Sequence, residues 1–195
     1  NSIFIRQSDG VARTFYVDNL SVNVGADVNH AADGSVDSAL GTNWTAFGTL
    51  DALTRDTTTI YDTSGSVNVD TPAAVDRGVR NNLSITPSVS TQYLVTFYAK
   101  SSNTFNDIRV RYSRDGGTDF ESCVDYNTQA VSTSTWTEIT CTFTTDGTTA
   151  TNPDLIIDQP TSSNRNFYID GLSITLNTNT ASNVQVGGAN KGGPT

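Results

Sequence analysis

Hydrophobic and polar residues alternate along the middle of this chain of 195 residues. Between 91 and 102, four apolar residues fall on one side of an extended strand: Tyr93, Val95, Phe97 and Ala99. The pattern recurs between 106 and 117, where three apolar residues alternate with arginines: Ile108, Val110 and Tyr112. A period of two residues indicates antiparallel strands that have one face in a core.

Shorter runs of the same kind, separated by turn signals, predict further strands. They lie at 2–6, 13–22, 44–48, 56–61, 65–70, 77–87, 120–126, 134–145, 154–159 and 166–176. No stretch repeats its apolar residues with the period of a helix. About nine or ten short strands in one module predict an all-β sandwich.

The last strands of this pattern occur twice in the chain. Residues 2–24 and 154–176 align without a gap and share the pattern Phe-Tyr-[Val/Ile]-Asp. A repeat at a fixed interval is typical of tandem modules, so we expect a piece of a longer array. The expected parts are a terminal β-hairpin of a preceding module at 1–23, a complete module at 24–176, and a linker or extended tail at 177–195.

Each copy of the repeated ending contains a shift of phase. In the second copy, Phe167 and Ile169 have one parity, whereas Leu172 has the other. One extra residue at Asp170-Gly171 keeps all these side chains on the core side, which predicts a β-bulge there. The first copy shifts in the same way at Asp18-Asn19.

Composition and charge exclude several classes of binding partner for this protein. The net charge is −9 and the chain has no basic cluster, which argues against nucleic acids and anionic membranes. No stretch is long and apolar enough for membrane insertion. Cys123 and Cys141 both lie in strand-like runs of a chain poor in lysine. We expect a disulfide between them and an extracellular or cell-surface location, with two buried free thiols as the alternative.

An enzyme is not expected from this sequence. It has no Gly-x-Ser-x-Gly elbow, no phosphate-binding glycine loop and no zinc spacing around its single histidine, His30. Two carboxylates can flank a glycosidic bond. Here, however, most aspartates lie in turns, where Asp bonds the local backbone. No catalytic residue is therefore predicted, and His30 is expected in a loop.

The polar side of the two clearest strands is the candidate ligand surface. It carries Tyr98 with Arg109 and Arg111, and Tyr126 joins from the next strand. Sugars bind aromatic faces and planar polar groups, and this set supplies both. The alternatives are a solvated face whose arginines protect an edge strand, or a protein interface.

The two tryptophans are further candidates for stacking against sugars. Trp44 follows a loop and is predicted to bind carbohydrate, with a core position as the alternative. Trp136 has apolar neighbours in Ile139 and Phe143 and is expected in the core or at its rim.

The order of these signals resembles the carbohydrate-binding modules of families 4, 9 and 22. The residues that carry the resemblance are, in order, Trp44-Thr45, Thr63-Ser64-Gly65-Ser66, Leu83, Ile85 and Pro87, Gln92 to Lys100, Trp136-Thr137, Cys141 to Thr144 and Phe167 to Leu172. The resemblance implies a jelly-roll β-sandwich and a non-catalytic module that binds carbohydrate or attaches to a surface.

The resemblance also implies one structural calcium ion at Asp170, to which Asp27, Asp33 and Asp37 could add ligands. The stretch 27–32 lacks the Phe-Glu pair that the family usually has near this site. From the residues alone, Asp170 instead accepts hydrogen bonds from backbone amides that the bulge leaves unpaired. Both interpretations stay open on the sequence.

Two functions follow from the sequence. The first is a module of an extracellular tandem-repeat protein that binds a glycan for attachment. The second is a structural repeat of a surface fibre or adhesin stalk, whose partners are neighbouring repeats of the same protein. The repeated ending favours the second function, and the polar face favours the first.

Overall fold

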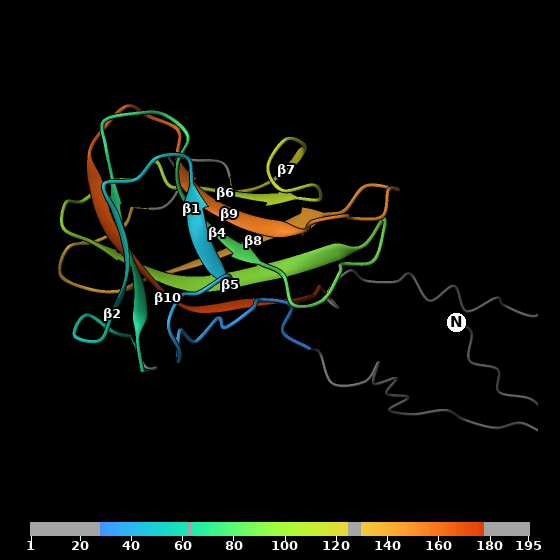
Figure 1. Ribbon diagram of the computed structural model, residues 1–195, viewed down its shortest axis with the longest axis horizontal. Coiled ribbons are helices and arrows are strands. Elements are labelled where there is room, and N and C mark those ends of the chain that lie inside the picture. The colour runs from blue at the N-terminus through green and yellow to red at the C-terminus, as the bar shows by residue number, and fades with distance from the viewer. Residues whose placement is uncertain (1–27, 62–63, 125–129, 178–195) are drawn as a thin grey trace, which may run out of the picture.

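The computed structural model describes residues 28–61, 64–124 and 130–177. This part of the chain forms ten strands and no helix, so none of its residues lies in a helix able to cross a membrane. The strands form two antiparallel five-stranded sheets packed face to face. Figure 1 shows β6, β7 and β9 in one layer and β5 and β10 in the other.

The first sheet has the order β1-β4-β9-β6-β7. Its strands are β1 (Trp44–Phe47), β4 (Arg77–Asn82), β9 (Asp154–Gln159), β6 (Arg109–Ser113) and β7 (Phe120–Val124). Apart from the consecutive strands β6 and β7, neighbours in the sheet are far apart in the sequence, as the Greek-key connections of a jelly roll require. The expected antiparallel jelly-roll β-sandwich is confirmed.

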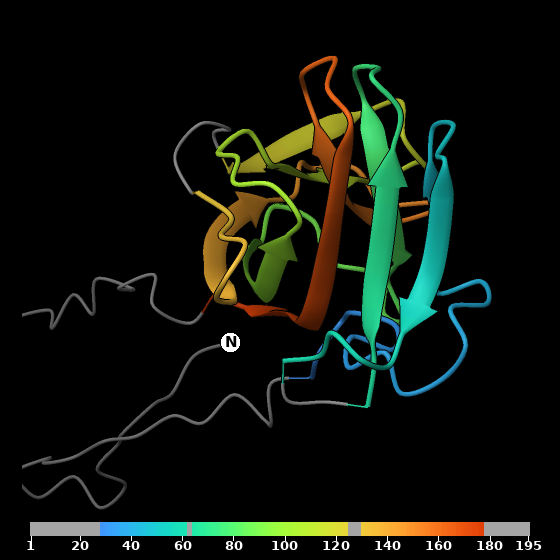
Figure 2. The ribbon, with the colours of Figure 1, turned by 90° about the vertical axis from the view of Figure 1, so that its left-hand side faces the viewer.

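The second sheet has the order β2-β3-β10-β5-β8. Its strands are β2 (Ala52–Asp56), β3 (Ser66–Thr71), β10 (Arg165–Leu176), β5 (Gln92–Ser101) and β8 (Thr137–Thr144). Figure 2 shows β10, β3 and β2 side by side. The long strands β5 and β10 pair with each other near the centre of this sheet.

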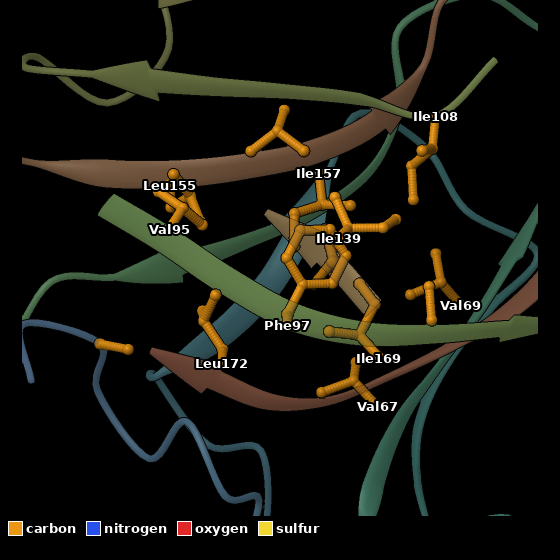
Figure 3. Packing of buried hydrophobic residues seen from close by; sticks show 14 of the residues in the cluster. Val67, Val69, Val95, Phe97, Ile108, Ile139, Leu155, Ile157, Ile169 and Leu172 are labelled. Atoms are coloured by element: carbon orange, nitrogen blue, oxygen red, sulfur yellow. The ribbon is translucent and has the colours of Figure 1, made fainter. Parts of the chain in front are cut away.

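The core lies between the two sheets and follows the alternation in the sequence. Every second residue of β5 is buried, from Tyr93 to Ala99. Phe97 and Ile139 of the second sheet meet Leu155 and Ile157 of the first (Figure 3). Burying such side chains stabilises the fold by roughly 1.5–3 kcal/mol for each residue before chain entropy is counted.

The β-bulge predicted in the last strand is present. Asp170 pairs with Tyr98 and Ser173 with Thr96, so two residues of β10 lie opposite one residue of β5. Gly171 has a φ of +62°, where residues with a Cβ are strained. The bulge returns Leu172 to the core side, where it is buried. The matching shift at Asp18-Asn19 lies outside the described residues.

A disulfide joins the two sheets. Cys123 of β7 and Cys141 of β8 are bonded, with a Cα–Cα distance of 5.5 Å, as the sequence predicts. Both strands lie at the end of their sheets, so the bond closes one side of the sandwich.

The strand predicted at 56–61 is wrong, because the strand is β2 and ends at Asp56. The Asp56 carboxylate accepts hydrogen bonds from the amides of Thr58 and Thr59, which turns the chain away from the sheet.

Candidate functional site

The predicted single polar face is wrong. Tyr98 lies on β5 of the second sheet, whereas Arg109 and Arg111 lie on β6 of the first. Residues 102–108 carry the chain from one sheet to the other, so β6 pairs with β9 and β7 and not with β5. The tyrosine and the two arginines therefore lie on opposite outer surfaces of the sandwich. Since β6 is an inner strand, protection of an edge strand is also ruled out for these arginines.

The outer side of the first sheet carries a cluster that we call the arginine face. It consists of Phe47, Arg80, Arg109, Arg111 and Phe120 above Asp154, Ile156 and Asp158. Val110 and Tyr112 point into the core, so the alternating arginines of β6 point outward. All six residues of β9 are buried, because the arginine face covers the outer side of that strand.

Asp158 holds the two arginines of β6 in place. Arg109 donates through Nε and Nη2 to its two carboxylate oxygens at 3.0 and 2.6 Å. Arg111 donates to Oδ2 at 2.7 Å, and Arg109 also bonds Asp76 at the surface. Burial alone would lower the pKa of Arg109, but the hydrogen bonds and charge of Asp158 and Asp76 raise this pKa above its ordinary value.

Gly78 makes room for this ion pair. It pairs with Asp158 across β4 and β9, and a Cβ on Gly78 would lie 2.2 Å from the Ile157 carbonyl oxygen and 2.8 Å from Asp158 Cβ. Any larger residue would move β4 away from β9 or displace the carboxylate.

Aromatic rings flank the guanidinium groups. The Cζ atom of Arg111 lies 4.1 Å from the centroid of Phe120 and 5.3 Å from that of Phe47. The two rings meet edge to face at 6.3 Å. The Cζ atom of Arg80 also lies over the Phe47 ring, 5.5 Å from its centroid. The face therefore combines ring surfaces with planar charged groups whose orientation is fixed.

Three buried polar atoms of this face have no hydrogen-bond partner among the described residues. They are Arg80 Nε, Arg111 Nε and Asp154 Oδ1. Burial raises the pKa of Asp154, and Arg80, whose Nη1 is 3.5 Å away, offsets this only in part. Buried polar atoms normally have a partner, and an ordered water is suited to supply it.

The other predicted sugar-binding residues fall elsewhere. Trp44 is 1% exposed, and its Nε1 donates to the Asp33 carbonyl, so its prediction as a stacking platform is wrong. Its ring fills the core because β1 pairs with β4 from the first residue onward. Tyr126 lies outside the described residues. Trp136 is half-buried on the outer side of the second sheet, so its prediction as a residue of the core or its rim is wrong. His30 is in a loop, but it is buried, and its Nδ1 lies 3.2 Å from the Ile85 carbonyl.

Asp170 is fully buried below the loop that follows β2. Its Oδ2 accepts a hydrogen bond from the Tyr61 amide and its Oδ1 from the Gly171 amide, both at 2.7 Å. Among the described residues, no three His, Cys, Asp or Glu side chains gather as metal ligands. Asp33 accepts hydrogen bonds within its own turn, Asp37 accepts them from Ser35 and from Ser64 of another loop, and Asp27 is outside the described part. Both Asp170 oxygens thus accept backbone amides, and the calcium ion stays a prediction.

Comparison with known proteins gives the family. Residues 28–164 match the family model described as carbohydrate binding domain. The chain belongs to this carbohydrate-binding domain family. No curated protein sequence matches it. Family membership supports carbohydrate binding by a non-catalytic module.

Solved structures share the fold of this carbohydrate-binding domain at low identity. The CBM22-1 xylan-binding domain of Paenibacillus barcinonensis Xyn10C is 14% identical with a TM-score of 0.63, over 80% of this chain and 97% of that one. The CBM22-1–GH10 modules of Clostridium thermocellum xylanase 10B, complexed with xylohexaose, are 17% identical with a TM-score of 0.59, over 77% and 28%. The Stig cyclase Fisc from Fischerella sp. is 12% identical with a TM-score of 0.55, over 77% and 98%, so an enzyme also has this fold.

Sequence reasoning missed six members of the arginine face: Phe47, Arg80, Phe120, Asp154, Ile156 and Asp158. The run Asp154–Gln159 contains one signal for these partners. It has acidic residues near both ends of an apolar strand, and such residues need basic partners when the strand is buried. No local signal joins Phe47 to Phe120, because the strands that carry them are brought together only by the sheet order.

Proposed function

We propose that this domain binds a neutral polysaccharide on the arginine face and attaches a larger extracellular protein to it. The observation that carries the proposal is Arg111, which is fixed by Asp158 at 2.7 Å and lies 4.1 Å from the Phe120 ring. Planar groups held in this way can bond pairs of sugar hydroxyls, while neighbouring rings accept the apolar face of a sugar.

Two further features support this face as the binding surface. Asp158 holds both arginines before any ligand arrives, so little side-chain entropy is lost on binding. A net charge of −9 favours uncharged glycans over acidic ones. Xylan is the first glycan to test, because two structures of similar fold bind xylan or xylohexaose.

The repeated ending favours a second candidate function. In a tandem array, residues 1–23 and 177–195 would be the couplers between neighbouring repeats of a surface fibre or adhesin stalk. The partner would then be another copy of this module and not a glycan. Electron microscopy of the full-length protein tests this candidate, since regular end-to-end contacts between modules support it and unconnected beads oppose it.

Calorimetric titration with soluble xylan, β-glucan and mannan oligosaccharides tests the glycan proposal. We expect Arg111→Ala and Phe47→Ala each to weaken the Kd at least about tenfold, equal to about 1.4 kcal/mol. Thr149→Ala is the matched control, since Thr149 is exposed in the loop between β8 and β9 and belongs to neither sheet. Thermal melts of each variant separate loss of binding from loss of fold. Binding by the wild type that both variants retain in full would remove the arginine face from the proposal.

A further inference from the structure

Three aromatic rings gather on the outer side of the second sheet. The Tyr61 ring stacks on the Tyr98 ring with centroids 3.6 Å apart and an angle of 16° between their planes. The Trp136 ring meets Tyr61 edge to face at 6.1 Å. Tyr61 is 41% exposed, although large aromatic side chains of a monomer are usually mostly buried. We call Tyr61, Tyr98 and Trp136 the tyrosine platform.

The loop that carries Tyr61 is fixed to the sheet at three points. The Tyr61 amide donates to the buried Asp170 carboxylate at 2.7 Å. Trp136 Nε1 donates to the Ile60 carbonyl at 3.1 Å, and Ser66 Oγ to the Thr59 carbonyl at 2.6 Å. A fully buried carboxylate therefore holds an exposed ring in place. Such preorganisation lowers the entropy cost of binding a ligand.

Polar groups border the tyrosine platform. Glu138 is exposed and lies directly opposite Tyr98 in the antiparallel pair of β5 and β8. Cross-strand partners have Cβ atoms about 5 Å apart, so the Glu138 carboxylate lies beside the rings. Lys100 follows on the same side of β5, opposite Tyr168 of β10. An acceptor, a donor and a ring surface thus occur within the area of one or two sugar rings.

We propose that the tyrosine platform is a second carbohydrate-binding site, which stacks one pyranose ring of a neutral glycan. The carbohydrate class rests on the family, but the site does not depend on the arginine face, which lies on the opposite sheet. The remaining outward residues nearby are polar, among them Thr96, Thr140 and Asn68. A protein interface needs a larger apolar centre than three rings provide, so a sugar ring fits better.

The tryptophans allow a direct test on the full chain. The chain has two tryptophans, and Trp44 is 1% exposed, so acrylamide quenching of the fluorescence reports Trp136. We expect xylohexaose, cellohexaose or mannohexaose to protect Trp136 in the wild type and in Arg111→Ala. Tyr61→Ala should weaken the Kd for this protection about tenfold. Tyr61→Phe keeps the ring and should bind like the wild type.

The outcomes separate this site from the arginine face. If none of the three oligosaccharides protects Trp136, or if Tyr61→Ala is protected as well as the wild type, the second site is excluded. Concentration-dependent dimers in light scattering that Tyr61→Ala abolishes would mean a protein-docking surface and would also overturn it. The arginine face fails by a different result, namely calorimetric binding that Arg111→Ala and Phe47→Ala leave unchanged.

Discussion

Asp154 and Asp158 lie at similar positions on the same strand but differ in how well their charges are paired. Both lie on β9, point to the outer side of the first sheet and are fully buried. Asp158 has arginine nitrogens at 2.6 and 2.7 Å on one oxygen. Asp154 has a single arginine nitrogen at 3.5 Å, and burial raises its pKa. The charge of Asp158 is therefore paired with two arginines, whereas the buried charge of Asp154 is only weakly paired.

This contrast predicts opposite effects of the same substitution. We expect Asp158→Asn to lower the free energy of unfolding by about 2 kcal/mol, less than for a fully buried pair because Arg109 and Arg111 keep some solvent contact. We expect Asp154→Asn to change it by less than about 1 kcal/mol or to raise it, since a buried charge is removed. Urea denaturation at pH 7 measures both. Equal losses in the two variants would contradict the assignment.

The raised pKa of Asp154 also predicts a pH dependence. The native state then binds a proton at a pH where the unfolded Asp, with a pKa of about 3.9, has lost it. This contribution to stability is present below about 3.9 and is lost as the pH rises through the native pKa of Asp154. Asp154→Asn should therefore show a smaller loss of stability than the wild type across this window. Denaturation curves at steps of pH check it, and parallel profiles for the two proteins would refute it.

At the scale of the strand, the bulge in β10 depends on Gly171. With φ at +62° and Tyr98 Cδ2 3.3 Å from the position of an added Cβ, Gly171→Ala should cost about 1–2 kcal/mol. Gly147→Ala is the matched control, because nothing lies within 4 Å of its added Cβ and its φ is not in the positive range. Thermal melts compare the two variants. Equal melting temperatures would show that the bulge tolerates an ordinary residue.

The two interpretations of Asp170 predict different responses to calcium. Its carboxylate oxygens accept hydrogen bonds from the Tyr61 and Gly171 amides, so we expect EDTA and added calcium to leave the melting temperature unchanged. Asp170→Asn should lower it, because one amide loses a charged acceptor. A rise in melting temperature with calcium that Asp170→Asn abolishes would establish the metal site instead.

Local patterns predicted the elements but not their neighbours. Alternation identified the buried side of β5 and β6, and the phase shift located the bulge at Gly171. Alternation does not say which sheet a strand joins. The prediction that Tyr98 and Arg111 share one surface is wrong for this reason. That choice depends on pairing with β9, which is more than 40 residues later in the chain. The arginine face is equally non-local, since its residues come from all five strands of the first sheet, which the sheet order brings together.

At the scale of the whole molecule, the two proposed sites point in opposite directions. The arginine face lies outside the first sheet and the tyrosine platform outside the second, with the core between them. Packed sheets are about 10 Å apart, and side chains extend beyond each sheet. A single extended glycan chain cannot lie across both surfaces at once. One domain with two working sites therefore bridges two glycan chains.

Bridging has a measurable consequence that simple binding lacks. We expect the wild type to make a solution of soluble polysaccharide turbid, because each domain links two chains and each chain carries many sites. Arg111→Ala and Tyr61→Ala should each still bind the polysaccharide in affinity electrophoresis but leave the solution clear, and the double variant should bind more weakly than either. Excess oligosaccharide should clear the wild-type mixture, which separates bridging from self-association of the protein. Turbidity that persists in either single variant would mean that one face alone forms the links, and the two-site arrangement would then be wrong.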